Sequence, residues 1–369
     1  MKVCVFGGTS LYRLPIYNQM AKETGCDFYI SGDDPKMGIV TYDLDKLINF
    51  KGELGVEKRI IWNFTWVKGM VRVFLKPYDL FVIGGPFGLS GWIIILLSKF
   101  SKKKVASWSH GMYGRETGLR KVIKKIFFKC CDYNFVYNKR AKELMISSGI
   151  KAEKIIPVGN ALDTDEELRI RSSLKKEPLY KSLFGNDYPV LIFVGRVIKD
   201  KRLEQVIQSM ASLKDKGVYI NFFVIGKDVD GVNLKQLAKD SGISDQVYMY
   251  GPCYDNNIIA SYFYNASLCV SPGPIGLTAT NAMTYGCPVV SHDDFNHQGP
   301  EFEAIIPGKT GDFFHSNDVK DLSNIILKWT SISNEDREDI RKNCFSEVDK
   351  FWNIYSETEA FKRIFCIEA

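Results

Sequence analysis

Short apolar segments of strand type alternate with helical patterns along the second half of this 369-residue chain. These candidate strands cover residues 189–194, 218–225, 247–250, 268–270 and 288–291. Between the first two, apolar residues at 203–210 recur with the spacing of one helix face. Strands separated by helices form right-handed crossovers and parallel sheets. A less regular alternation occupies the first half, so the sequence predicts an α/β protein throughout.

The length of the chain exceeds what one ordinary core accommodates and fits two domains of about 150–200 residues. A polar stretch follows the candidate strand at 155–158. We therefore expect a first domain at 1–158 and a second at 159–346. Trp352, Tyr355 and Phe361 lie in a helical pattern near the C-terminus. This pattern predicts a helix at about 347–369 that returns to pack on the first domain.

The segment 271–310 joins a strand end to a Pro/Gly turn that opens directly into a helix near Leu277. Such a turn leaves backbone N–H groups unpaired, and the positive end of the helix dipole faces the same space. About 75 residues upstream, a strand ends at Gly195 and is followed by Arg196 and Lys201. Two cations beside two helix N-termini predict a site for a diphosphate.

The charge is distributed unevenly between the two halves. Residues 1–158 carry 26 Lys+Arg and 13 Asp+Glu, whereas the remaining 211 residues carry 23 and 30. The basic residues concentrate at 99–104 and 120–129, and the second segment forms a helix with one cationic and one apolar flank. Such a helix either contacts an anionic membrane surface or packs its apolar flank inward while its lysines are solvated. No nucleic-acid motif accompanies the charge, so we expect no nucleic-acid partner.

The cysteines and the apolar segments indicate a cytoplasmic location. Nine cysteines are scattered without CxxC spacing, as in a protein with reduced thiols. The apolar residues 3–6 are too few for a signal peptide, and no run reaches the roughly 18 residues of a membrane helix.

Three linked motifs in the second half carry a resemblance to a known family. A strand is followed by G-R-x4-K, and a G-L-x3-E-A-M-x2-G-x-P-V block and an E-x4-G-x-T-G block come later. The matching residues are Gly195, Arg196 and Lys201; Gly276, Leu277, Ala282, Met283, Gly286, Pro288 and Val289; and Glu303, Gly308, Thr310 and Gly311. Residues 190–315 therefore resemble the nucleotide-sugar-binding domain of GT-B glycosyltransferases, specifically glycosyltransferase family 4. The resemblance implies two facing Rossmann-like domains with parallel sheets and an interdomain cleft.

Two positions depart from the family pattern. The family usually has two glutamates eight positions apart, and this chain has Gly273 and Asn281 there. In the family the second glutamate holds the ribose hydroxyls, and Asn281 can still accept and donate hydrogen bonds without charge. The first glutamate faces the donor sugar, and Gly273 has no side chain for that contact.

The resemblance implies a donor site in the second domain and transfer with retention of anomeric configuration. The predicted donor-binding residues are Gly195, Tyr250, Pro252, Gly273, Pro274, Ile275, Gly276, Leu277, Thr278, Asn281 and Glu303. Negative charge builds on the departing diphosphate, so Arg196 and Lys201 are the predicted catalytic cations. They act without a metal or other cofactor, the nucleotide sugar being a co-substrate. His292, His297 and Asp293 are better read as a loop for sugar hydroxyls or solvent than as metal ligands.

In the first domain, His110 follows a strand at 105–109 and precedes a glycine. Ligands bind at this edge of parallel sheets, so His110 either hydrogen-bonds the donor sugar or polarises the acceptor hydroxyl, or it caps a loop carbonyl. Gly7 and Gly8 follow the first strand and either allow close approach of the acceptor or only form a turn.

The sequence thus predicts a retaining glycosyltransferase whose acceptor is a saccharide or a lipid-linked saccharide. The basic first domain favours an acceptor at the inner membrane face, in surface-polysaccharide assembly. Two alternatives stay open: a GT-B nucleotide-sugar epimerase, and a non-catalytic partner subunit that has lost both glutamates.

Overall fold

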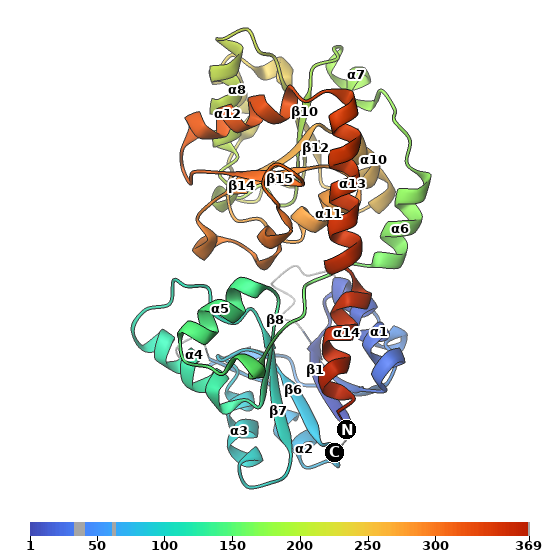
Figure 1. Ribbon diagram of the computed structural model, residues 1–369, viewed down its shortest axis with the longest axis vertical. Coiled ribbons are helices and arrows are strands. Elements are labelled where there is room, and N and C mark those ends of the chain that lie inside the picture. The colour runs from blue at the N-terminus through green and yellow to red at the C-terminus, as the bar shows by residue number, and fades with distance from the viewer. Residues whose placement is uncertain (33–40, 61–63, 368–369) are drawn as a thin grey trace. The chain divides into compact units, whose positions relative to one another are not determined.

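The computed structural model describes residues 1–32, 41–60 and 64–367 (Figure 1). It divides into two compact units, Met1–Asp163 with Asn353–Ala369, and Thr164–Trp352. The sequence predicts that the first domain ends at residue 158 and that the segment returning to it begins at about residue 347. Each unit consists of a parallel sheet with helices on both faces, which is the predicted α/β class. In the described part of the chain, no helix combines the length and apolarity needed to cross a bilayer.

The first unit contains a parallel sheet in the order β3-β2-β1-β6-β7-β8-β9. Its strands are β1 (Val3–Gly8), β2 (Asp27–Ser31), β3 (Phe50–Leu54), β6 (Leu80–Ile83), β7 (Lys104–Ser109), β8 (Tyr133–Val136) and β9 (Ile155–Pro157). A short antiparallel pair, β4 (Lys58–Arg59) and β5 (Thr65–Trp66), lies outside this sheet. Successive residues of β1 face opposite sides, so Val3 and Val5 enter one core and Cys4 the other.

Helices cover both faces of this sheet. They are α1 (Leu14–Thr24), α2 (Met70–Phe74), α3 (Leu89–Ser98), α4 (Gly118–Cys130), α5 (Lys139–Ser147) and α14 (Ile354–Phe365). Residues of α1 and α14 share one core, and residues of α2 to α5 share the other. The helices α1 and α14 lie side by side, although more than 300 residues separate them in sequence (Figure 1).

The second unit contains a parallel sheet in the order β12-β11-β10-β13-β14-β15. Its strands are β10 (Val190–Val194), β11 (Asn221–Ile225), β12 (Val247–Gly251), β13 (Leu268–Ser271), β14 (Val289–His292) and β15 (Gly311–Phe314). Strand order runs outward in one direction from β10 and in the other from β13. The two strands are adjacent, with Leu191 opposite Leu268, so the order in which strands are added to the sheet reverses between them.

Two helical layers cover this second sheet. The helices are α6 (Thr164–Ser173), α7 (Leu179–Phe184), α8 (Glu204–Lys214), α9 (Leu234–Asp240), α10 (Asn256–Asn265), α11 (Thr278–Thr284), α12 (Val319–Thr330) and α13 (Asn334–Phe351). Ile192 of β10 packs in the core that includes α10, α11 and α13, whereas Leu191 packs with α8 and α12. The period-2 alternation of β10 therefore supplies both cores.

The prediction of a single helix at the C-terminus is wrong. Helix α13 ends at Phe351 and α14 begins at Ile354, because Asn353 adopts an extended conformation between them. The Asn353 side chain caps α14, accepting hydrogen bonds from the N–H groups of Tyr355 (3.1 Å) and Ser356 (2.9 Å). The break divides the aromatic residues of this segment between the units. Trp352 packs in a core of the second unit, and Phe361 packs in a core of the first unit.

Candidate functional site

The change of direction between β10 and β13 positions the predicted diphosphate residues of the second unit. Ligands of open parallel sheets bind beyond the carboxyl ends of the strands at such a point. Gly195 and Arg196 directly follow β10, and the turn 272–277 directly follows β13. Gly195 has φ +147°, a conformation that favours glycine. The topology therefore brings together two segments that lie about 75 residues apart in sequence.

The segment 195–203, here called the Lys201 loop, packs against this turn through its backbone. Gly273 donates its N–H to the Lys201 carbonyl at 2.9 Å, and the Lys201 ammonium donates to the Pro274 carbonyl. A Cβ atom on Gly273 would lie 1.9 Å from the Asp200 carbonyl oxygen and 2.6 Å from the Lys201 Cα. The position of the missing first glutamate therefore has no room for any side chain in this structure.

Lys201 and Arg196 lie in one electrostatic neighbourhood. Arg196 is exposed, whereas Lys201 is partly buried. Burial lowers the pKa of the Lys201 ammonium, and the Arg196 guanidinium lowers it further, against the opposing carboxylates of Asp200 and Glu301. Two neighbouring cations are stabilised when an anion binds between or beside them.

Helix α11 starts at the predicted position but is only seven residues long. Thr278 Oγ1 donates to the Val194 carbonyl at 3.2 Å, which ties the first turn of the helix to the end of β10. Because so short a helix has a weak macrodipole, we assign the positive potential of the site to the side chains of Arg196 and Lys201.

Gln298 and Glu301 belong to this neighbourhood and are absent from the predicted site. The buried Gln298 amide accepts from the Ile275 N–H and donates to Ser291 Oγ and the His292 carbonyl, each at 2.8 Å. Glu301 is also buried, and a Cβ on the adjacent turn residue Gly276 would lie 3.9 Å from its Oε2. The acidic residue predicted from the sequence is Glu303, which is partly exposed. The sequence shows a polar loop after the strand at 288–291, but it does not indicate which residues of this loop face the turn.

The other predicted donor residues divide into two groups. Asn281 lies on α11, and its side-chain oxygen is buried without a hydrogen-bond partner among the described residues. Tyr250 lies at the end of the edge strand β12, and its ring packs 5.7 Å from Phe223 and 5.5 Å from Tyr262. Because β11 separates β12 from β10, the sheet does not bring Tyr250 and Pro252 next to the turn.

The histidine-rich loop forms separate pairs. His297 contacts Asp294 and His315 contacts Asp293, each at 2.7 Å. His292 is fully buried, and its Nδ1 accepts from the Asp294 N–H at 3.2 Å. Burial and then the nearby Arg202 lower the pKa of His292 to about 4. Within residues 1–32, 41–60 and 64–367, no group of three or more His, Cys, Asp or Glu side chains is placed to hold a metal ion.

In the first unit, Gly7 and Gly8 are part of β1 and not of a turn after it. They pair with Ile30 and Ser31 of β2. A Cβ on Gly7 would lie 2.8 Å from the Tyr17 hydroxyl, so glycine is required there for the close packing of α1. Both glycines also line a cavity of about 240 Å³ at the carboxyl edge of this sheet.

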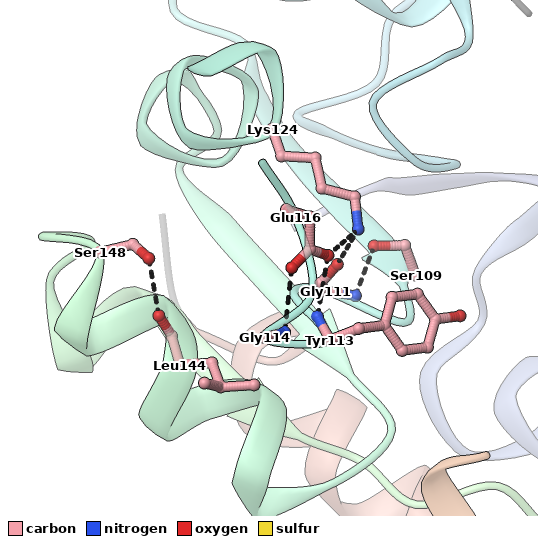
Figure 2. Close-up of polar contacts among 8 residues, drawn as sticks. All are labelled: Ser109, Gly111, Tyr113, Gly114, Glu116, Lys124, Leu144 and Ser148. Carbon is pink, nitrogen blue, oxygen red and sulfur yellow. Dashed lines mark hydrogen bonds and ion pairs between the residues drawn. The ribbon is translucent and has the colours of Figure 1, made fainter. Parts of the chain in front are cut away.

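His110 follows β7 and is exposed at the beginning of a loop with a buried ion pair. Its ring lies 4.8 Å from the ring of Tyr137, edge to face. Figure 2 shows how the loop is held: Glu116 accepts from the N–H groups of Tyr113 and Gly114, each at 2.9 Å. The Lys124 ammonium lies 2.5 Å from Glu116 Oε1 and 3.0 Å from the carbonyl of the glycine at position 111 (Figure 2).

The charges around this loop shift the pKa values of two groups in a consistent direction. Desolvation by the surrounding protein, and then the cations Arg13 and Lys124, lower the pKa of His110 below its ordinary value. Burial alone would raise the pKa of Glu116, but the Lys124 ammonium and the Tyr113 N–H lower it overall. At neutral pH the loop therefore carries a neutral His110 and an ionised Glu116.

Helix α4 divides its apolar residues between the core and the surface. Phe127 and Phe128 are fully buried. Leu119, Val122 and Ile126 recur along the other side and are 59%, 49% and 48% exposed. The basic residues Arg120, Lys121 and Lys129 are exposed as well. One apolar side of the helix thus packs inward, and a second apolar side is exposed beside cations.

Comparisons with known proteins agree with this architecture. Residues 176–346 match the family model described as Glycosyl transferases group 1. The capsular polysaccharide biosynthesis glycosyltransferase CapM of Staphylococcus aureus is 24% identical over 267 residues, which cover 67% of this chain and 66% of CapM. The chain thus spans slightly less than two thirds of this curated relative.

Solved structures resemble the whole chain. Anabaena HepE in complex with UDP matches with a TM-score of 0.74 and 14% identity, over 99% of each chain. The lipopolysaccharide outer core galactosyltransferase WaaB, in its apo form, matches with a TM-score of 0.72 and 16% identity, over 98% of this chain and 99% of WaaB. The chain therefore has the GT-B fold of two parallel-sheet α/β domains, and its second domain matches the Glycosyl transferases group 1 family.

Proposed function

We propose that this chain is a family 4 type retaining glycosyltransferase that moves a sugar from a nucleotide diphosphate sugar to a saccharide or lipid-linked saccharide. The observation that carries the proposal is the convergence of Arg196, Lys201 and the Gly273–Gly276 turn at the point where the second sheet changes direction. The family match of residues 176–346 and the UDP held by the structural relative HepE support a nucleotide-sugar donor.

The proposed reaction depends on the charge of the leaving group. Cleavage of the anomeric C–O bond leaves an additional negative charge on the nucleotide diphosphate. Arg196 and Lys201 stabilise this charge more strongly than that of the intact donor, which lowers the barrier. The acceptor oxygen attacks from the face that the diphosphate leaves, and its proton passes to the departing diphosphate oxygen. The configuration is then retained, and a metal is not required for charge neutralisation.

The remaining candidates take supporting roles in this proposal. Asn281 binds the ribose hydroxyls through its unpaired amide oxygen. Gln298 and Glu301 fix the turn in the conformation that receives the donor. In the first unit, His110 contacts the acceptor hydroxyl as a neutral imidazole, because desolvation and then the nearby cations Arg13 and Lys124 lower its pKa.

We further propose that α4 contacts an anionic membrane surface, which places the enzyme near a lipid-linked acceptor. The exposed side chains of Leu119, Val122 and Ile126, together with the neighbouring cations, support this contact. Flotation with vesicles of phosphatidylcholine, with and without phosphatidylglycerol, tests it. Binding that requires the anionic lipid and falls in Val122→Asp supports the contact, and absence of binding to both vesicles refutes it.

The donor proposal is tested by thermal shift against UDP, GDP, TDP, CDP and CMP, each with and without magnesium. A ligand at about 100 times its Kd adds roughly 2.7 kcal/mol of stability. Arg196→Ala is expected to lose the shift, whereas Lys199→Ala, an exposed lysine of the same loop, is expected to keep it. Incubation with the matching nucleotide sugar and acceptor then gives a product whose anomeric configuration is read by NMR.

The same experiments separate the alternatives. Conversion of the donor sugar without acceptor identifies an epimerase. Absence of any nucleotide shift, with a second chain that copurifies, identifies a partner subunit. Inverted configuration in the product refutes the retaining mechanism but not the transfer.

A further inference from the structure

The cavity at the carboxyl edge of the first sheet has the features of a second binding site, apart from the diphosphate residues of the second unit. It measures about 240 Å³ and is lined by Gly7, Gly8, Gly84 and Gly85 at the strand ends, and by Arg13 and Trp108. Pockets for drug-sized ligands measure roughly 300–1,000 Å³. This cavity is slightly smaller and therefore fits a single small group.

Arg13 is held rigidly at this cavity. Its guanidinium carbon lies 4.8 Å from the Trp108 ring, 5.2 Å from the Tyr137 ring and 5.0 Å from the Tyr12 ring. One terminal nitrogen, Nη2, donates to the Tyr137 hydroxyl. Burial lowers the pKa of Arg13, but the surrounding phenols and the Glu357 carboxylate raise it more, so the side chain stays charged.

Two residues that line this cavity each hold a donor with no acceptor among the described residues. Arg13 Nη1 and Trp108 Nε1 are both buried, and neither has a hydrogen-bond partner in the described part of the chain. No ion pair joins Arg13 to a carboxylate among the described residues, although the charge of the Glu357 carboxylate acts on it. A buried donor without a partner is unfavourable, and a buried cation more so. Glu57 also lines the cavity, but it is exposed, so water and salt screen its charge.

We propose that this cavity binds an oxyanion, a carboxylate or phosphate carried by the acceptor, through Arg13 and Trp108. An oxyanion offers several lone pairs and no donor, which matches an arginine fork and an indole N–H without their own acceptors. A neutral sugar hydroxyl satisfies one of these donors but brings no negative charge to the cation. The acceptor of this enzyme is therefore an acidic saccharide or a saccharide attached to a phosphate.

This inference rests on the proposed transferase function, but its first test does not depend on transfer. Isothermal titration of the full-length protein compares four probes at equal ionic strength: glucuronate, glucose 6-phosphate, glycerol 3-phosphate and glucose. Both acidic sugars are expected to bind at least tenfold more tightly than glucose. Weaker binding of glycerol 3-phosphate identifies the sugar acid as the recognised unit, and equal binding identifies a phosphate such as that of a lipid head group.

Two variants connect binding to the named residues. Arg13→Gln is expected to lose roughly ten- to a hundredfold in affinity for the acidic probes and nothing for glucose. Arg72→Gln, an exposed arginine of the same unit, serves as the matched control. If Arg13→Gln does not fold, Trp108→Phe decides the question, since it keeps an aromatic ring at this position and removes the indole N–H; a severalfold loss is expected.

The outcomes distinguish the two proposals. If glucose binds as tightly as the acidic probes, or if Arg13→Gln folds and keeps the preference, the oxyanion site is refuted. Nucleotide binding that depends on Arg196 remains measurable in the same samples and judges the donor site separately. Acidic probes that bind while every nucleotide fails refute the donor site and leave the oxyanion site standing.

Discussion

Replacement of Gly273 by alanine tests whether the turn and the Lys201 loop form one unit. The added Cβ would lie 1.9 Å from the Asp200 carbonyl oxygen, whereas ordinary contacts begin at 3.4 Å. The backbone at residue 273 must therefore move away from the backbone at residue 200 by about 1.5 Å. Overpacking of this kind costs about 1–3 kcal/mol. Moving the two segments apart also weakens the 2.9 Å hydrogen bond from the Gly273 N–H to the Lys201 carbonyl, which contributes about 0.5–1.5 kcal/mol.

The loss of glycine flexibility in the unfolded chain offsets about 0.4–1 kcal/mol of this cost. We therefore expect Gly273→Ala to lower the free energy of unfolding by about 1–3 kcal/mol in urea denaturation. It is also expected to weaken nucleotide diphosphate binding about tenfold, because the Lys201 ammonium moves with its loop. Gly273→Glu, which restores the family residue, is expected to be worse and not better.

Gly276→Ala is the matched control, since the same methyl group there would meet only Glu301 Oε2 at 3.9 Å. Its stability is expected to stay within about 0.5 kcal/mol of the parent. If Gly273→Ala is as stable as Gly276→Ala and binds nucleotide as well as the parent protein, the packing argument is wrong. The turn would then open easily, and the missing glutamate would need another explanation.

Three further predictions concern stability. Because burial and then Arg202 lower the pKa of His292 from 6.5 to about 4, the unfolded state binds more protons between these values. Stability therefore drops by about 3 kcal/mol as pH is lowered through that window, and His292→Asn makes this dependence shallower in pH-resolved denaturation. Glu116→Gln leaves the buried Lys124 uncompensated and is expected to cost about 3 kcal/mol in urea unfolding, and a cost under 1 kcal/mol would contradict the pairing. Asn353→Ala removes the α14 cap and should cost about 1 kcal/mol, seen as a lower Tm.

The sequence predicted the architecture because strands and helices have different apolar periods. The alternation around β10 and the crossover helix α8 predicted a parallel sheet. The sequence also predicted one diphosphate site from Gly195 and the Gly273–Gly276 turn, and the structure places these segments after the neighbouring strands β10 and β13. The break at Asn353 escaped prediction, since Trp352 and Phe361 continue one helical pattern although they enter different cores. A periodic pattern records that a residue is buried, but not in which core.

The side-chain partners in the site were less predictable. Gln298 and Glu301 lie in irregular backbone, where no period tells which side chains face the turn. The steric reason for Gly273 is equally invisible, because it depends on the approach of residue 200 from another strand connection. The sequence does not single out Arg13, whose aromatic surroundings include Trp108 of β7 and Tyr137, the residue that follows β8.

The packing of α14 beside α1 has a consequence for synthesis. Phe361 contacts Trp108 and Phe135, at ring distances of 4.7 and 4.5 Å, and so helps to complete a core whose members outside α14 all lie before residue 164. About 190 residues separate Asp163 from Asn353, and translation at about 5–20 residues per second takes roughly 10 to 40 s to cross them. During this time the first domain emerges from the ribosome with part of its aromatic core uncovered, while the second domain can already fold. The domain that is translated first is therefore the one that is completed last.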